Sequence, residues 1–426
     1  MEHPKADAEP TDGPPPRLHV TPKNRAVPLA APGEFAPLEL GRLSVWPPVV
    51  LAPMAGVTNP PFRVICQEQG APLCVSEMIT ARAWLRANRL THLLARPAAG
   101  ETLRSVQVYS ADPDEVREFV KRLVAGDAPV IDGVEPDRRP VDHVDLNFGC
   151  PVPKVTRAGG GAAIPLKPRL LARIVRAAVE SAGDVPVTIK VRKGISTELP
   201  TWRDSGRVAQ EEGAAAISLH GRTAAELYSG SADWSTIGEL VAHVDIPVLG
   251  NGDLWEAFDA LRMMRATGCA GVVVGRGCLG RPWLFAELAA VFDGREPDPP
   301  PTVREIRRLM DRHARALMDF FGPEMGMRQM RKWGAWYTKG LSRSAAVRGD
   351  LVRVESLEDM HAALARLDPD ERLPLRALEA NRAKGNRRQK VALPEGYLDD
   401  LDDDTPPKGP VSPEEQRAWE KALEGG

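Results

Sequence analysis

Cysteine is scarce in this sequence. The chain has five cysteines among 426 residues, and none of them stands in a Cys-x-x-Cys motif. Small secreted domains depend on many paired cysteines, and structural zinc sites need closely spaced ones. The scarcity therefore argues against a disulfide framework and a metal site, and it indicates a reducing compartment. We expect a cytoplasmic protein that holds no metal ion.

Long apolar runs are absent as well. No stretch of 18 uncharged apolar residues occurs, and the N-terminus is polar and rich in proline. A transmembrane helix or a signal peptide would need an apolar run, so we expect neither membrane insertion nor secretion. The formal net charge of −2 gives no sign of a polyanionic partner. A whole-chain sum can, however, conceal regions of opposite charge.

Eight short apolar runs recur along the chain, each followed by a loop of small or polar residues and then by a helical pattern. Such runs, alternating with helices, are typical of a parallel sheet whose two faces are both covered. Eight of them predict an α/β fold closed into a (β/α)8 TIM barrel, and an open doubly wound sheet is the alternative. The runs are VVLAPMAG from Val49, LCVSEMIT from Leu73, SVQVYS from Ser105, HVDLNFGC from His143, PVTIKVR from Pro186, AAISLHGR from Ala215, IPVLGNGD from Ile246 and GVVVGRG from Gly271.

Residues able to do chemistry stand at the end of almost every run, which favours the barrel. In a barrel the carboxyl ends of all strands meet at one mouth, where such enzymes have their active sites. The residues are Met54 with Ala55, Glu77, Gln107, Asn147 with Cys150, Lys190 with Arg192, His220 with Arg222, Asn251 with Asp253, and Gly275 with Arg276.

The fourth run ends in the segment Asp145-Leu-Asn-Phe-Gly-Cys-Pro151. Gly149 permits a tight backbone turn, and Pro151 cannot continue the hydrogen-bond ladder of a strand. Cys150 is therefore expected on a tight lip at the barrel mouth, where a thiol could be reactive. A lone cysteine is more often a small buried hydrophobe, and this alternative stays open on the motif alone.

Glycine-rich segments follow the seventh and eighth runs, at Gly250-Asn-Gly-Asp253 and Gly275-Arg-Gly-Cys-Leu-Gly280. The second matches Gly-x-Gly-x-x-Gly, but it lacks the further strand and acidic residue of a dinucleotide-binding fold. In barrels these two loops often bind a phosphate on backbone N–H groups. We favour a phosphorylated cofactor, and glycines that serve tight turns alone are the alternative.

Composition changes at both ends of the expected barrel domain, residues 46–300. Residues 1–45 are predicted to form a mostly disordered leader whose last part could pack on the barrel. Residues 301–385 are predicted to form a smaller, all-helical domain, with 11 Lys or Arg against 5 Asp or Glu between 301 and 350. Such a basic module suits an RNA backbone, although its aromatic residues are better explained as core. The acidic tail, residues 386–426, is predicted to be disordered.

The motifs at the barrel mouth, taken together and in this order, resemble those of the tRNA-dihydrouridine synthases, most closely the bacterial B-type branch. The resemblance covers about residues 45–350. The matching segments are Leu51-Ala-Pro-Met-Ala-Gly-Val-Thr58, Asn147-Phe-Gly-Cys-Pro151, Lys190-Val-Arg-Lys-Gly194, His220-Gly-Arg-Thr223, Gly250-Asn-Gly-Asp253, and Arg331-Lys332 followed by Trp336-Tyr-Thr-Lys-Gly340.

The resemblance implies a flavin-binding barrel with a small C-terminal helical domain, acting on tRNA. The implied activity is reduction of the C5=C6 bond of selected uridines to 5,6-dihydrouridine by reduced FMN, which NADPH reloads. Cys150 would be the catalytic residue that gives the proton to C5. The residues implied to hold FMN are Pro53, Met54, Ala55, Gln107, Lys190, His220, Asn251, Gly252, Asp253, Gly275 and Arg276, and those implied to bind RNA are Asn147, Arg192, Arg328, Arg331 and Lys332.

The sequence departs from the family pattern in places and leaves other functions open. Residues 126–140 are an expected insertion, and Ala162-Ala-Ile-Pro-Leu166 replaces a leucine-rich run. From the residues alone, Lys190 could instead form a Schiff base in an aldolase-type lyase. An RNA-binding protein with the barrel as scaffold and a flavin oxidoreductase acting on a free pyrimidine are further alternatives. We expect a monomer whose macromolecular partner is tRNA.

Overall fold

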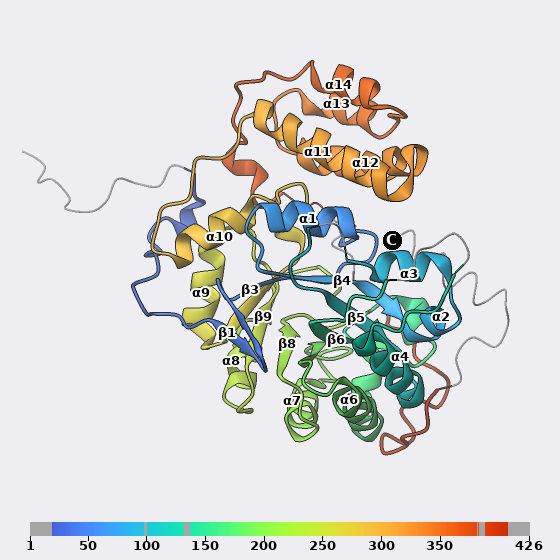
Figure 1. The fold of residues 1–426 in the computed structure, drawn as a ribbon. Helices are drawn as coiled ribbons and strands as arrows, with labels where there is room; N and C mark the ends of the chain where they lie inside the picture. Colours follow the sequence, from blue (N-terminus) through green and yellow to red (C-terminus); the bar gives the residue numbers. More distant parts are fainter. Residues whose placement is uncertain (1–18, 98–99, 132–136, 381, 383–387, 408–426) are drawn as a thin grey trace, which may run out of the picture.

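Eight parallel strands close into a barrel in the computed structural model, which describes residues 19–97, 100–131, 137–380, 382 and 388–407 (Figure 1). The strand order is β10-β3-β4-β5-β6-β7-β8-β9, so the last strand pairs with the first. The predicted (β/α)8 barrel is confirmed. Its strands are β3 (Val49–Leu51), β4 (Leu73–Thr80), β5 (Ser105–Tyr109), β6 (His143–Phe148), β7 (Val187–Arg192), β8 (Ala216–His220), β9 (Val248–Asn251) and β10 (Gly271–Val274).

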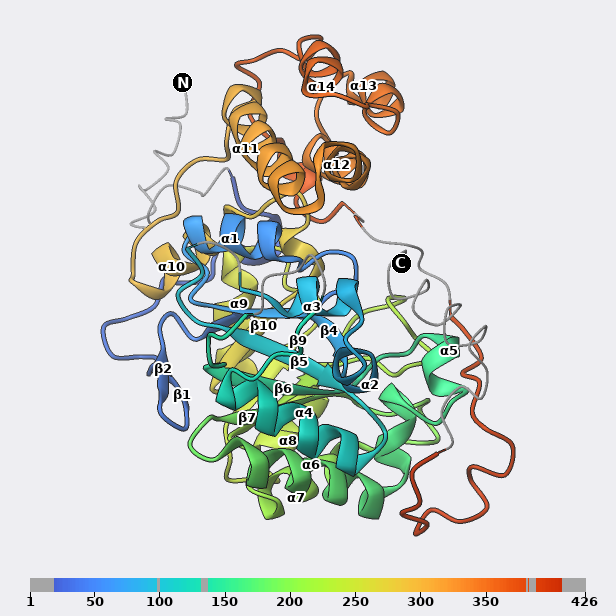
Figure 2. The same ribbon diagram turned by 45° about the vertical axis from the view of Figure 1, so that its right-hand side comes forward.

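Helices cover the outside of the barrel between successive strands (Figures 1 and 2). Several begin with a polar cap followed by proline: Asn59 accepts the N–H of Phe62 at 3.1 Å, and Asp112 accepts the N–H of Asp114 at 2.9 Å. Among the described residues, no helix is long and apolar enough to cross a bilayer. The barrel helices are α1 (Pro60–Glu68), α2 (Ala81–Leu85), α3 (Arg89–Ala95), α4 (Pro113–Ala125), α5 (Pro153–Thr156), α6 (Pro168–Ala182), α7 (Trp202–Glu211), α8 (Ser235–Val241), α9 (Ala257–Thr267) and α10 (Leu284–Phe292), with short 3-10 turns η2 (Gly161–Leu166) and η3 (Arg276–Cys278).

A short antiparallel hairpin, β1 (Leu38–Leu40) and β2 (Leu43–Val45), packs on apolar side chains at the amino ends of the barrel strands. Leu38 is 1% exposed and lies in one apolar cluster with Val50 and Leu249. Further upstream, η1 (Pro22–Asn24) is tied to the barrel. Residues 19–45 thus pack on the barrel, in agreement with the expectation for the last part of the leader, and residues 1–18 lie outside the described part of the chain.

The helical domain stands above the barrel, over α1 (Figure 1). An aromatic cluster joins the two parts: the ring centroid of Trp333 lies 4.3 Å from that of Phe62 and 4.7 Å from that of His313. Trp333 and Tyr337 are fully buried, so these aromatic residues are core, as the sequence indicates. The helices are α11 (Val303–Phe321), α12 (Pro323–Tyr337), α13 (Ser344–Leu351) and α14 (Leu357–Leu364), followed by the 3-10 turn η4 (Leu375–Ala377).

Residues 388–407 lie along the barrel beside α5 and α6 (Figure 2). Tyr397 is 6% exposed, and Asp403 Oδ2 lies 2.6 Å from Lys167 Nζ on the barrel. The predicted disorder of the tail does not hold for these residues, because its acidic side chains find basic partners on the barrel. Residues 386–387 and 408–426 of the predicted tail, and residues 132–136 of the expected insertion, lie outside the described residues.

A buried ion pair joins α1 to the segment before β5 and gives a test of the fold. Arg63 Nε and Nη2 donate to the two carboxylate oxygens of Glu101 at 2.6 and 3.0 Å, and neither side chain is more than 2% exposed. Leaving one buried charge without its partner costs about 3–5 kcal/mol. Glu101→Gln should lower the free energy of unfolding by that order, as measured by urea denaturation.

The matched control is Glu180→Gln, which removes the half-exposed partner of Arg117 at the barrel surface. Exposed ion pairs contribute little to stability. A Glu101→Gln protein that unfolds at the same urea concentration as the Glu180→Gln protein would contradict the assigned role of the buried pair.

Candidate active site

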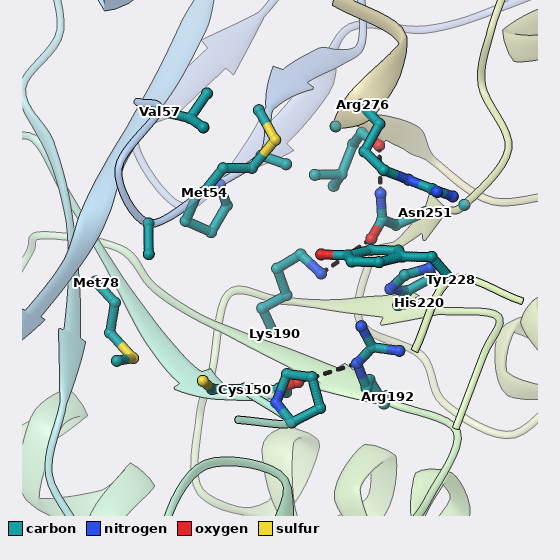
Figure 3. A pocket seen from close by; sticks show the side chains of 18 of the residues that line it. Met54, Val57, Met78, Cys150, Lys190, Arg192, His220, Tyr228, Asn251 and Arg276 are labelled. Carbon is teal, nitrogen blue, oxygen red and sulfur yellow. Dashed lines mark hydrogen bonds between the residues drawn. The ribbon is translucent and has the colours of Figure 1, made fainter. Parts of the chain in front are cut away.

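A cavity of about 590 Å³ opens at the carboxyl ends of the barrel strands (Figure 3). This volume is within the range of cofactor and small-molecule sites. Met54, Val57 and Met78 form an apolar wall on one side, and the polar side chains gather opposite them (Figure 3). Among the described residues, the charged side chains lining the cavity are five cations and one carboxylate: Lys154, Lys190, Arg192, Arg276, Lys332 and Asp253. The cavity thus favours an anionic ligand.

The register of the strands decides which polar side chains become neighbours. Asn147 of β6 pairs with Lys190 of β7. Arg192, at the end of β7, pairs with His220 of β8, and His220 pairs with Asn251 of β9. Residues that lie up to 43 positions apart in the chain, as Asn147 and Lys190 do, are therefore placed side by side by backbone pairing alone.

The Cys150 loop is ordered by the side chain of Asn147. Asn147 Oδ1 accepts the backbone N–H groups of Gly149 at 3.2 Å and Cys150 at 3.0 Å. Its Nδ2 group donates to Gln107 Oε1 at 2.8 Å. The expected tight lip after β6 is present, and its thiol lines the cavity half-buried.

Burial is the main influence on the Cys150 thiol, and it raises the pKa because a thiolate is poorly solvated there. A hydrogen bond from the Val152 N–H and the charge of Arg192 act in the opposite direction without cancelling the rise in pKa. Cys150 is therefore protonated at neutral pH. A group in this state can serve as an acid, whereas a nucleophile would require the thiolate.

Gln107 is fixed from both ends of its amide. Its Nε2 group donates to Asp145 Oδ2 at 2.7 Å, and Thr188 Oγ1 donates to the other oxygen of Asp145 at 2.6 Å. Burial raises the pKa of Asp145 to about 6, although these two hydrogen bonds oppose the rise. Because Gln107 is only 1% exposed, its amide holds Asn147 in place more than it offers free groups to a ligand.

Lys190 projects into the cavity toward Asn251 (Figure 3). Its Nζ donates to Asn251 Oδ1 at 3.0 Å, and Asn251 Nδ2 donates to the carbonyl of Val273 at 2.7 Å. Burial, followed by the charge of Arg192, lowers the pKa of Lys190 to about 8, and Asp145 opposes this shift. At pH 7 Lys190 therefore remains mainly cationic.

The far end of the cavity holds a charge cluster around Asp253. Arg222 Nη2 donates to Asp253 Oδ2 at 2.8 Å, and Arg276 Nη2 lies 3.5 Å from Asp253 Oδ1. The Arg276 guanidinium also lies 4.2 Å from the ring centroid of Tyr228. Two arginines share one carboxylate, so this end keeps a positive charge. Burial and the nearby cations, Arg192 first among them, hold the pKa of His220 well below its usual range.

Arg192 uses its donors within the protein. Nε donates to the carbonyl of Gly149 at 3.1 Å, and Nη1 donates to the carbonyls of Thr223 at 2.9 Å and Leu227 at 3.1 Å. The side chain is 5% exposed. It therefore braces the Cys150 loop against the loop after β8 while its charge faces the cavity.

Lys332 of α12 connects the helical domain with the cavity. Its Nζ donates to the carbonyl of Gly56 and to Gln329 Oε1, the latter at 2.8 Å. The N–H of Gly56 donates to Glu77, whose pKa is raised to about 7, chiefly by burial. Gly56, beside the apolar wall, is thus held through its N–H by the barrel and through its carbonyl by α12.

The family model described as dihydrouridine synthase matches residues 50–371, more than half of the chain. A protein of Mycobacterium tuberculosis strain H37Rv named probable tRNA-dihydrouridine synthase is 47% identical over 382 residues, covering 87% of this chain and 95% of that protein. The tRNA-dihydrouridine synthase B of Escherichia coli K12 is 32% identical over 327 residues, covering 77% and 98%. The chain belongs to the dihydrouridine synthase family.

In this family member, the residues expected to hold the cofactor all line the cavity, and so do Cys150, Asn147, Arg192 and Lys332. Arg328 and Arg331 do not. Arg328 is exposed on α12 and lies 2.8 Å from Glu324, whereas Arg331 Nε donates to the carbonyl of Val354 at 2.9 Å.

Three aromatic side chains of this dihydrouridine synthase were not predicted as site residues, namely Tyr228, Trp255 and Trp336, and all three line the cavity. Tyr228 stands between Arg276 and Arg192, with ring-to-guanidinium distances of 4.2 and 5.8 Å. Two features of the sequence could have pointed to Tyr228 as a site residue. The chain has only four tyrosines, and Tyr228 lies eight positions after His220, in the loop that follows the sixth apolar run.

The raised pKa of Cys150 predicts a slow, pH-dependent alkylation by iodoacetamide. Because the thiolate is the reactive form, modification should be slow at pH 7 and accelerate only above the ordinary thiol range. The other four cysteines are buried, so native Cys150→Ser protein should take up almost no label. Peptide mass spectrometry would measure the site and the rate. Rapid labelling of Cys150 at pH 7 would show a thiolate and contradict this assignment.

Proposed function

We propose that the protein binds FMN in this cavity and reduces the C5=C6 bond of uridines in tRNA, with NADPH as the source of electrons. The observation that carries the proposal is the protonated, half-buried thiol of Cys150 in the wall of a cation-rich cavity. The names of the relatives support a tRNA substrate. The product is 5,6-dihydrouridine.

The residues of the cavity fit FMN. The wall of Met54, Val57 and Met78 suits a planar apolar ring, and Lys190 and Arg276 supply charges complementary to a phosphate and to the polar edge of the ring. Glycine at positions 252 and 275 keeps side chains out of the loops after β9 and β10. When bound, FMN supplies the hydride that the uracil C6 atom receives.

Cys150 supplies the matching proton. The Sγ–H bond breaks, the proton goes to C5, and the thiolate that remains is stabilised by the charge of Arg192. Asn147 keeps the thiol on the lip by holding the N–H groups of Gly149 and Cys150. Because the thiol is half-buried and not sealed, solvent can return the proton before the next turnover.

Most of the tRNA lies outside the cavity in this proposal, because the cavity is far smaller than a tRNA molecule. A uridine that reaches a barrel mouth has to leave its stacked position, which costs a few kcal/mol. The basic helical domain borders the cavity through Lys332. In this proposal its basic residues hold the phosphates around the flipped uridine.

The first test is direct conversion. Wild-type protein supplied with FMN, NADPH and unmodified tRNA transcript should form dihydrouridine, detected by mass spectrometry of the nucleosides. Cys150→Ala should bind FMN and oxidise NADPH at the wild-type rate when a surrogate electron acceptor is supplied. With tRNA as the acceptor it should form dihydrouridine about 10²–10⁴-fold more slowly, because only proton delivery is lost. Activity of Cys150→Ala within a few-fold of wild type would remove the thiol from the mechanism.

A second test concerns the tRNA contact. Arg328→Ala should weaken tRNA binding and reduce the slope of log affinity against log salt by about one, because one phosphate contact disappears. Arg117→Ala on α4 is the matched control, since Arg117 is an exposed, ion-paired arginine on the barrel. Equal affinities and salt slopes for the two variants would place the tRNA elsewhere. Filter binding at several salt concentrations measures both quantities.

A further inference from the structure

Residues 388–407, here called the C-terminal strap, contact the loop that carries Cys150. Gln389 Nε2 donates to the carbonyl of Pro151 at 2.8 Å and to the carbonyl of Ala224 at 3.0 Å. The backbone N–H of Gln389 donates to the carbonyl of Ala225 at 2.9 Å. One residue of the strap thus ties the loop after β6 to the loop after β8.

Tyr397 provides a second contact, further along the chain from Cys150. Its hydroxyl lies 3.1 Å from the carbonyl of Gly159 and 3.3 Å from that of Ala163, and one hydroxyl proton is shared between them. A Cβ atom at Gly159 would lie 2.9 Å from Pro407 and 3.0 Å from the Tyr397 ring. The strap and residues 159–163 therefore fit closely, and only glycine leaves room for the contact.

The segment held by Tyr397 in turn supports Cys150. The N–H of Ala162 donates to the carbonyl of Cys150 at 3.0 Å. A Cβ atom at Gly161 would lie 2.7 Å from that carbonyl oxygen. Gln389 reaches the residue after Cys150 directly, and Tyr397 reaches Cys150 through residues 159–163. The two routes are independent because they use different hydrogen bonds.

Aspartates anchor the far end of the strap on and beside α6. Asp403 Oδ2 lies 2.6 Å from Lys167 Nζ, and the carbonyl of Asp404 accepts Arg173 Nη1 at 2.8 Å. The Lys167 side chain is 8% exposed and also lies over the Tyr397 ring, 4.7 Å from its centroid. Hydrogen bonds from Lys167 and Thr405 hold the pKa of Asp403 well below its usual range. The acidic residues of the strap thus help to hold it on the barrel.

We propose that the C-terminal strap positions the Cys150 thiol for proton transfer, with Gln389 as the positioning residue. This inference rests on the proposed function, which makes Cys150 the proton donor. Gln389 does not touch the reacting atoms. It fixes the separation between the Cys150 loop and the loop that carries Tyr228, and a shift of about 1 Å in such a geometry can cost up to roughly 10²-fold in rate.

The test variant is Gln389→Met, which keeps the length of the side chain and removes both donated hydrogen bonds. Lys390→Met is the matched control, because Lys390 is the next residue of the strap and is exposed. Stopped-flow absorbance follows reduction of the bound flavin by NADPH and its reoxidation by tRNA. Iodoacetamide labelling of Cys150 follows the exposure of the loop, and thermal unfolding follows stability.

Gln389→Met should reoxidise with tRNA about tenfold more slowly and label severalfold faster at Cys150. Reduction by NADPH, flavin content and the melting temperature should remain those of the wild type, and Lys390→Met should match the wild type throughout. If Gln389→Met fails to fold, Tyr397→Phe takes its place, because it removes only the hydroxyl contact to Gly159 and Ala163. It should show the same pattern with a smaller change.

Two outcomes would overturn the inference. In one, reoxidation and labelling of Gln389→Met, or of Tyr397→Phe in its place, equal those of Lys390→Met. In the other, both half-reactions and the melting temperature fall together, which shows general destabilisation. Failure of the proposed function has a different signature, since wild-type protein would then not be reoxidised by tRNA at all, while the labelling comparison would still report the contact between strap and loop.

Discussion

Pairing between β10 and β3 is the constraint on which the rest of the site depends. With the barrel closed, each strand end has two fixed neighbours, and the register places Asn147 beside Lys190 and His220 beside Asn251. An open sheet would leave the loops after β3 and β10 at opposite edges. Closure instead brings the apolar wall around Met54 and the cationic end around Arg276 to the two sides of one cavity.

The fold and most of the candidate site could be predicted from the sequence. Each barrel strand is visible as a short apolar run, and the polar residues of the candidate site stand at the ends of these runs. The uses of individual side chains could not be predicted. From the sequence, Gln107 and Arg192 are expected to bind a ligand directly. In the structure Gln107 bonds to Asp145 and Asn147 of β6, and Arg192 donates to backbone carbonyls of two loops. Tyr228 lies outside every motif, and it lines the cavity because the loop after β8 carries it there.

Composition predicted disorder for residues 388–407, which are instead held on the barrel, whereas packing of the last part of the leader was expected. Residues rich in proline or in acid have too little apolar surface to fold alone, and this is the basis for predicting disorder. Such a segment needs no core of its own when a folded surface supplies the partners. Thr21 and Asn24 bond to Glu256 on the barrel, and Asp403 bonds to Lys167. A local composition cannot reveal a partner more than 200 residues away.

The contact between Gln389 and Pro151 spans 238 residues of sequence. A ribosome adds about 5–20 residues per second, so the partner of this loop emerges roughly 12–48 s after the loop itself. The barrel strands are all synthesised before the strap, and a newly made barrel therefore exists for a time without it. During that interval the carbonyl of Pro151 lacks its hydrogen bond from Gln389, so this support of the Cys150 loop can form only after the barrel strands have been made.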